Sequence, residues 1–182
     1  MVATPAAAEP FRVSVNYMVG GRWLEGTKVS AGRSSVQLEG NELSMGGTVE
    51  LVKRFGPLRL GGQLGTDAML FPRDVSVVSP GPLNTAAEAT DGVSSLIFVN
   101  ASPVVGALTG EDGQLQGWVD FLLTLEVTSA RVGRERHFGF APVPTLRIGA
   151  ALPIGRDGAI ELSFLASYFG GPRLAFGMGV RF

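Results

Sequence analysis

Apolar and polar residues alternate along most of this chain, and this pattern predicts β-strands rather than helices. Side chains on a strand point alternately to its two sides, so a two-residue period gives each strand one apolar and one polar face. No stretch of the chain shows a helical period. The pattern predicts an all-β domain over 11–182. Its eight expected strands are 11–19, 42–51, 58–70, 93–107, 115–127, 145–154, 160–168 and 173–182.

The connections between these strands differ systematically in length. In an up-and-down arrangement three short turns share one end of the sheet with both termini, and three long loops lie at the other end, together with the short turn 170–172. Short turns at one end and long loops at the other are typical of transmembrane β-barrels, where the loops face the exterior. The short turns are 55–57, 109–113 and 155–158, and the long loops are 24–40, 72–92 and 129–137.

Three prolines interrupt the pattern, because proline donates no hydrogen bond to a strand ladder. Pro103 predicts an irregularity inside its strand, and Pro142 and Pro144 are expected to break the entry to the strand 145–154.

Composition narrows the class of protein. Hydrophobic residues make up 45% of the chain and charged residues 17%. No run approaches the ~20 apolar residues of a membrane-spanning helix, so a membrane protein with this sequence has to be a barrel. The net charge of −1 does not favour nucleic-acid binding. Without cysteine and with a single histidine we expect no metal site, and no motif indicates a cofactor.

The last strand and the overall pattern together resemble a known family, the small eight-stranded bacterial outer-membrane barrels of the OmpA and OmpX type. The resemblance implies an eight-stranded antiparallel up-and-down transmembrane β-barrel in the bacterial outer membrane. Its implied partners are outer-membrane lipid and the outer-membrane assembly machinery, which reads the terminal strand of such proteins. That strand carries an apolar residue at every second position: Leu174, Phe176, Met178, Val180 and Phe182.

The aromatic rims expected of such a barrel are thin, with only two Tyr and two Trp in the chain. Phe11 and Phe182 are assigned to the short-turn rim, and Trp23, Phe138 and Tyr168 to the long-loop rim.

Charge placement favours an apolar exterior. The apolar faces carry no Asp, Glu, Lys or Arg, and one Arg or Lys on the lipid face at mid-bilayer costs roughly 2 to 4 kcal/mol. The alternative is a soluble lipocalin-like carrier, whose apolar face points inward to a small apolar ligand. Small residues on the polar face suit a narrow interior, and a water-exposed face would be rich in lysine, whereas the chain has only Lys28 and Lys53.

If the polar face is interior, its charges are expected to pair and to fill the barrel without a wide channel, although solvation by interior water is the alternative. A register in which opposed residue numbers sum to about 342 places Phe169 opposite Arg173 and Glu161 opposite Arg181. Glu50, Asp120 and Arg147 fall near mid-height. The expected interior network comprises Arg12, Glu50, Arg59, Asp120, Arg147, Glu161 and Arg181.

These features predict a non-enzymatic outer-membrane protein with a structural or surface-interaction role, such as adhesion or partner binding. Loop 72–92 is apolar enough to contact an extracellular protein or surface ligand, or to pack on itself. The second hypothesis is a lipid-modifying enzyme, for which His137 with Ser129 or Ser94 are the candidates, although no motif connects them. The segment 1–10 lacks the apolar core of a signal peptide and is expected to be a flexible mature end.

Overall fold

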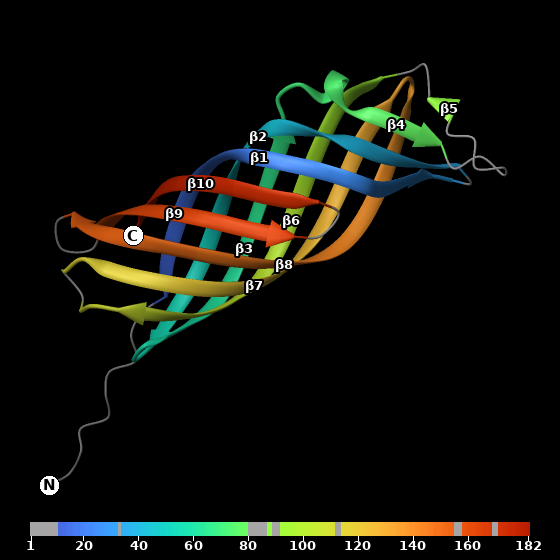
Figure 1. Cartoon of the computed structure of the whole chain (residues 1–182). Helices are drawn as coiled ribbons and strands as arrows, with labels where there is room; N and C mark the ends of the chain where they lie inside the picture. The colour runs from blue at the N-terminus through green and yellow to red at the C-terminus, as the bar shows by residue number, and fades with distance from the viewer. Residues whose placement is uncertain are drawn as a thin grey trace, which may run out of the picture.

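The computed structural model describes residues 11–32, 34–79, 87–88, 92–111, 114–154, 158–168 and 171–182, so the segment 1–10 lies outside it. Eight long antiparallel strands follow one another around a ring, and β1 pairs with β10 to close it (Figure 1). The predicted eight-stranded antiparallel barrel is therefore confirmed. The ring consists of β1 (Arg12–Ala31), β2 (Ser34–Phe55), β3 (Leu58–Met69), β6 (Val93–Thr109), β7 (Gln116–Val132), β8 (Glu135–Ile154), β9 (Gly158–Tyr168) and β10 (Pro172–Arg181).

The described residues between β3 and β6 form three short elements. They are the 3-10 helix η1 (Pro72–Asp74), β4 (Ser76–Ser79), which pairs with β2, and β5 (Ala87–Glu88), which pairs with β4. Among the described residues, no helix has the length and apolar character required to cross a membrane.

Two of the predicted long loops are strands, so the expectation of loops at 24–40 and 129–137 was wrong. β1 and β2 stay paired as far as Ala31 and Ser34, with a shift in register between Leu24 and Thr27. β7 and β8 join through a tight turn in which Gly133 has φ 58. In these extensions the inner face of each strand becomes apolar and the outer face polar, the reverse of the arrangement in the rest of the barrel. A strand prediction that follows one continuous apolar face therefore ends where this reversal begins.

The prolines affect the strands unequally. Pro103 pairs with Gly62 of β3, but the ladder between β6 and β7 skips from Ala101 to Val104, as predicted. The expectation that Pro142 and Pro144 break β8 was wrong, since the strand continues through both. They lie beyond the last pair that β8 forms with β9, and a strand edge without a neighbour tolerates proline.

β9 and β10 are the shortest strands of the ring, and at the end near β4 they stop short of their neighbours β8 and β1, which extend further (Figure 1). Opposed residue numbers in this pair sum to 340, as in Gly179 with Glu161, so the predicted sum of 342 was wrong by two. Phe169 lies outside the described residues. Beyond the short pair β1 meets β8 directly, where Ser30 pairs with Phe138.

The exterior of the barrel is apolar and its interior charged. Leu64 is 66% exposed and Phe121 is 55% exposed, whereas Glu50 is 1% exposed and Asp120 is fully buried. An apolar belt around a closed barrel with buried charges is the distribution that a lipid surrounding requires. The barrel therefore has the surface of a transmembrane protein, and not that of a soluble carrier with an apolar lumen.

Candidate functional site

A network of buried charges lies inside the barrel. Glu50 of β2 accepts hydrogen bonds from Arg59 of β3, at 2.6 Å, and from Arg147 of β8. Arg147 also donates to Asp120 Oδ2 at 2.8 Å and to Gln63 Oε1 at 2.7 Å. Two arginines thus face two carboxylates from four strands, and this pairing lowers the cost of keeping charge in a low-dielectric interior. Arg59 Nη1, Arg147 Nε and Asp120 Oδ1 have no hydrogen-bond partner among the described residues.

An indole ring lies against both arginines of this network. The ring of Trp118 on β7 is 4.5 Å from the guanidinium carbon of Arg59 and 4.8 Å from that of Arg147. Gly149 makes room for the ring, since a Cβ there would come within 2.2 Å of it. Gln63 and Trp118 were not among the expected network residues, although both lie on polar faces of expected strands, which is the signal that identifies them.

Two further groups of charges lie nearer the ends of the barrel. At the short-turn end, Arg181 is 3.5 Å from Glu161 and donates to Gln116 at 2.7 Å. The contact forms although the two are not directly opposed. Arg12 lines a small cavity there beside Glu50 and Arg181.

At the other end, Arg22 pairs with Glu126, and Arg173 lies 3.3 Å from Asp67. These four residues were missing from the expected network. All four are on polar strand faces, which was the available signal.

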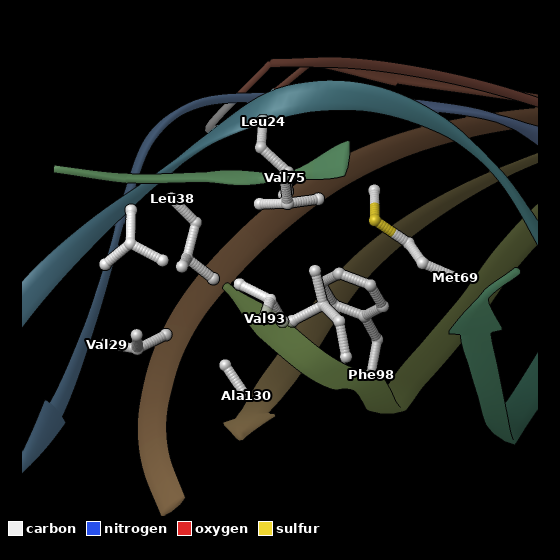
Figure 2. Close-up of a cluster of buried hydrophobic side chains, with 10 residues drawn as sticks. Leu24, Val29, Leu38, Met69, Val75, Val93, Phe98 and Ala130 are labelled. Carbon is white, nitrogen blue, oxygen red and sulfur yellow. The ribbon is translucent and has the colours of Figure 1, made fainter. Parts of the chain in front are cut away.

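Beyond the charges, at the end of the barrel opposite the short turns, the interior becomes hydrophobic. Side chains from β1, β2, β3, β6, β7 and the segment after η1 form one buried cluster, most of which Figure 2 shows. We call this end of the molecule, with the upper parts of β1, β2, β7 and β8, the head. The cluster comprises Leu24, Val29, Leu38, Met69, Val75, Val77, Val93, Leu96, Phe98 and Ala130.

The head changes the interpretation of loop 72–92. Six apolar residues of this loop suggested a contact surface, and two of them, Val75 and Val77, are buried in the cluster. Val78 of β4 is half-buried, and the remaining three, Pro80, Pro82 and Leu83, lie outside the described residues.

The candidate catalytic residues do not converge. His137 is buried on the inner face of β8, and its Nε2 lies 3.7 Å from Glu135. Ser129 pairs with Phe138, the outward neighbour of that histidine, so its side chain lies on the other face of the wall. Ser94 is exposed and donates to the Arg131 carbonyl at 3.3 Å. No serine–histidine pair is formed by these three residues.

Solved structures share this architecture. The chain aligns with Neisserial surface protein A (NspA) at TM-score 0.60 and 12% identity, covering 96% of this chain and 97% of that one. It aligns with Ail, the attachment invasion locus protein of Yersinia pestis, at TM-score 0.56 and 10% identity, covering 96% and 99%. The chain has the fold of these small surface barrels. Ail has also been solved with the heparin analogue sucrose octasulfate, a structure that aligns at TM-score 0.49 and 10% identity, covering 96% and 100%.

No protein-family model matches the sequence, and no curated protein matches it significantly. In this small-barrel fold, the apolar belt marks the part of the wall that faces lipid, and the head lies beyond it.

Proposed function

We propose that the chain is a non-enzymatic integral protein of the bacterial outer membrane, with a plugged interior and a rigid head that makes surface interactions. The observation that carries this proposal is the hydrophobic cluster of the head. Extensions of a barrel that pack on a shared apolar core hold one shape, whereas loops without a core are mobile and adapt. A rigid projecting surface is suited to binding a partner outside the cell.

The plug supports a role other than transport. Glu50, Arg59, Asp120 and Arg147 are all buried in one network, and Trp118 packs beside two of them, Arg59 and Arg147. In planar bilayers the protein is expected to show no large, stable conductance. A steady open channel in every insertion would contradict a plugged interior.

The partner surface that we assign is basic. Arg131 and Arg136 are opposed across the β7–β8 hairpin, and Arg134 lies in its turn. All three are exposed, with Glu135 as the acidic neighbour. Like charges directly opposite each other destabilise a hairpin, so an acidic partner would relieve this repulsion. Guanidinium groups suit sulfate and phosphate oxygens, and we therefore propose a sulfated or phosphorylated glycan as the partner.

Immobilised heparin tests this assignment, with the protein in a neutral detergent. We expect retention in low salt despite the net charge of −1, and elution as salt rises. The double variant Arg131→Gln/Arg136→Gln should lose most of this retention. Arg73→Gln, which removes an exposed arginine from η1, is the control and should elute close to the unmodified protein. Equal elution of the double variant and the unmodified protein would refute the basic surface.

A further inference from the structure

The barrel wall has a window between β1 and β8, above the short β9–β10 pair. The β1–β10 ladder ends at Arg22 and Arg173, and the β8–β9 ladder ends at Thr145 and Ser167. β1 and β8 meet again at Ser30 and Phe138. In between, 23–27 of β1 and 140–144 of β8 form no ladder pairs with each other in the described part of the chain, whereas Gly139 still packs closely against Lys28. We call this opening the lateral window.

A cavity of about 240 Å³ lies behind the lateral window and is lined by both of its edges. Leu24, Phe98 and Val143 supply apolar lining, and the charged residues of the lining are Arg22, Lys28, Glu126 and Arg173. The buried charges at the cavity are balanced, since Arg22 pairs with Glu126 and Arg173 with Asp67, and Lys28 at the exposed outer edge adds one positive charge.

The two arginines of the cavity are held in place and have donors to spare. The guanidinium of Arg22 lies 3.5 Å from the centre of the Phe98 ring and pairs with Glu126. Arg173 is held by Asp67 at 3.3 Å. Both arginines are more than nine-tenths buried, at 5% and 8% exposure.

Arg22 Nη1 and Arg173 Nε have no hydrogen-bond acceptor among the described residues. Buried donors without an acceptor are costly, so an oxyanion that accepts from both would be bound favourably.

The outer side of the lateral window lies where the apolar belt ends. Phe140 is 69% exposed at the edge of the cavity, Tyr168 is 70% exposed at the end of β9, and Trp23 lines the other edge. Exposed charges begin just beyond, with Lys28 and Arg136. Aromatic side chains at such a boundary lie at the level of lipid head groups, so the window opens toward the interface of the outer leaflet.

We propose that the lateral window binds one anionic amphiphile from the outer leaflet. Its phosphate or carboxylate accepts hydrogen bonds from Arg22 and Arg173, and its apolar chain passes out between β1 and β8 over Phe140. The cavity is larger than the roughly 150 Å³ that holds a benzene molecule, yet too small for a whole lipid. A head group and a few carbons therefore enter, and the remainder of the chain stays in the membrane.

Quenching of tryptophan fluorescence tests the proposal. Trp23 lines the cavity, whereas Trp118 is enclosed in the interior network, so a brominated chain in the window quenches mainly Trp23. The protein in dodecyl maltoside is titrated with ω-bromoundecanoate. We expect saturable quenching at one ligand per chain. Neutral ω-bromoundecanol should give only weak, non-saturating quenching.

Substitutions locate the site. Ala141→Phe, which fills the cavity and keeps every charge, should abolish saturable quenching, and Arg173→Gln should weaken binding tenfold or more. Arg173→Lys keeps the charge and should retain more affinity than Arg173→Gln. Ala150→Phe, on the lipid side of the same strand, is the control and should bind as the unmodified protein does.

Three outcomes would overturn the proposal: saturable quenching by the neutral alcohol, binding by Ala141→Phe equal to that of the unmodified protein, or full displacement by inorganic phosphate at the concentration of the fatty acid. The last would assign the cavity to a soluble oxyanion instead of an amphiphile. Folding of each variant is checked by circular dichroism. If Arg173→Gln does not fold, Ala141→Phe still decides, because it leaves both arginines in place.

Discussion

Glu50 holds two arginines at once in the middle of the barrel, Arg59 and Arg147. Replacing it by glutamine leaves both guanidinium groups buried with only Asp120 to balance them. Breaking a buried ion pair from one side costs about 3 to 5 kcal/mol, so we expect Glu50→Gln to lower the free energy of unfolding by that order. Urea titration in detergent micelles, followed by tryptophan fluorescence, measures the change.

Glu39→Gln is the matched control, because Glu39 is exposed on the upper part of β2. Its effect should stay within about 0.5 kcal/mol. If the two variants unfold at the same urea concentration, the interior charges are solvated by water and do not depend on one another.

Gly149 also contributes to the packing of the interior, because the Trp118 ring occupies the space that a side chain at this position would fill. Gly149→Ala forces the ring or the backbone to move, so we expect a loss of about 1 to 3 kcal/mol in stability. The near-ultraviolet circular dichroism of the tryptophan should change with it. Gly62→Ala is the control: a Cβ at Gly62, on the lipid face of β3, makes only ordinary contact, at 3.8 Å. Unchanged tryptophan dichroism in Gly149→Ala would show that the ring is not confined.

At the scale of single strands, the sequence indicates the segments inside the apolar belt well and their extensions poorly. The alternation of Leu58 to Leu70 corresponds closely to β3, since lipid on one side and packed charges on the other impose a strict two-residue period. β1 continues past Val19 to Ala31 because Leu24 and Val29 turn inward to the head cluster. Only the three-dimensional position of the head explains that change of phase.

The candidate site was predictable to a similar extent. Parity within a strand places Arg59 and Asp120 on the inner face, but the sequence does not reveal which charges meet across the barrel. Arg147 contacts Gln63, 84 positions away, through the curvature of the closed sheet. The lateral window depends on β9 and β10 being shorter than their neighbours. The predicted register of the β9–β10 hairpin was wrong by two residues.

The terminal strand gives the prediction that belongs to this scale. Phe182 exchanges backbone hydrogen bonds with Val13, at 2.9 and 3.2 Å, and its ring is exposed on the outer face. If the assembly machinery reads this strand, Phe182→Ala should lower the amount of barrel inserted in cells several-fold. Refolding of the purified variant in micelles should be nearly unchanged, because the backbone pairing is kept.

Phe11→Ala is the control, since Phe11 is similarly exposed at the same rim but lies outside the terminal strand. Equal losses in cells for both variants would mean that the two aromatic residues of this rim contribute alike. The special role of the terminal strand would then be refuted.

For the whole molecule, the interior and exterior exchange polarity along the barrel axis. Within the belt, charges face inward and apolar side chains outward; in the head, Phe98 and Leu38 are buried and charged residues such as Arg134 are exposed. This exchange follows from a change of solvent. Lipid excludes charge from the outer face, and water beyond the lipid restores the ordinary arrangement of a hydrophobic core with a polar surface.

A charge scan of the outer face tests that boundary. Leu64 is 66% exposed in the middle of β3, and Leu64→Lys should lower the stability of the barrel in phospholipid vesicles by about 2 to 4 kcal/mol. Leu58→Lys, on the same face at the short-turn end, should cost only about 0 to 1 kcal/mol, because lysine there reaches the interface. Both are measured by urea unfolding in the same vesicles. Equal costs at the two positions would mean that Leu64 does not lie at mid-bilayer, and the assignment of the apolar belt to lipid would be wrong.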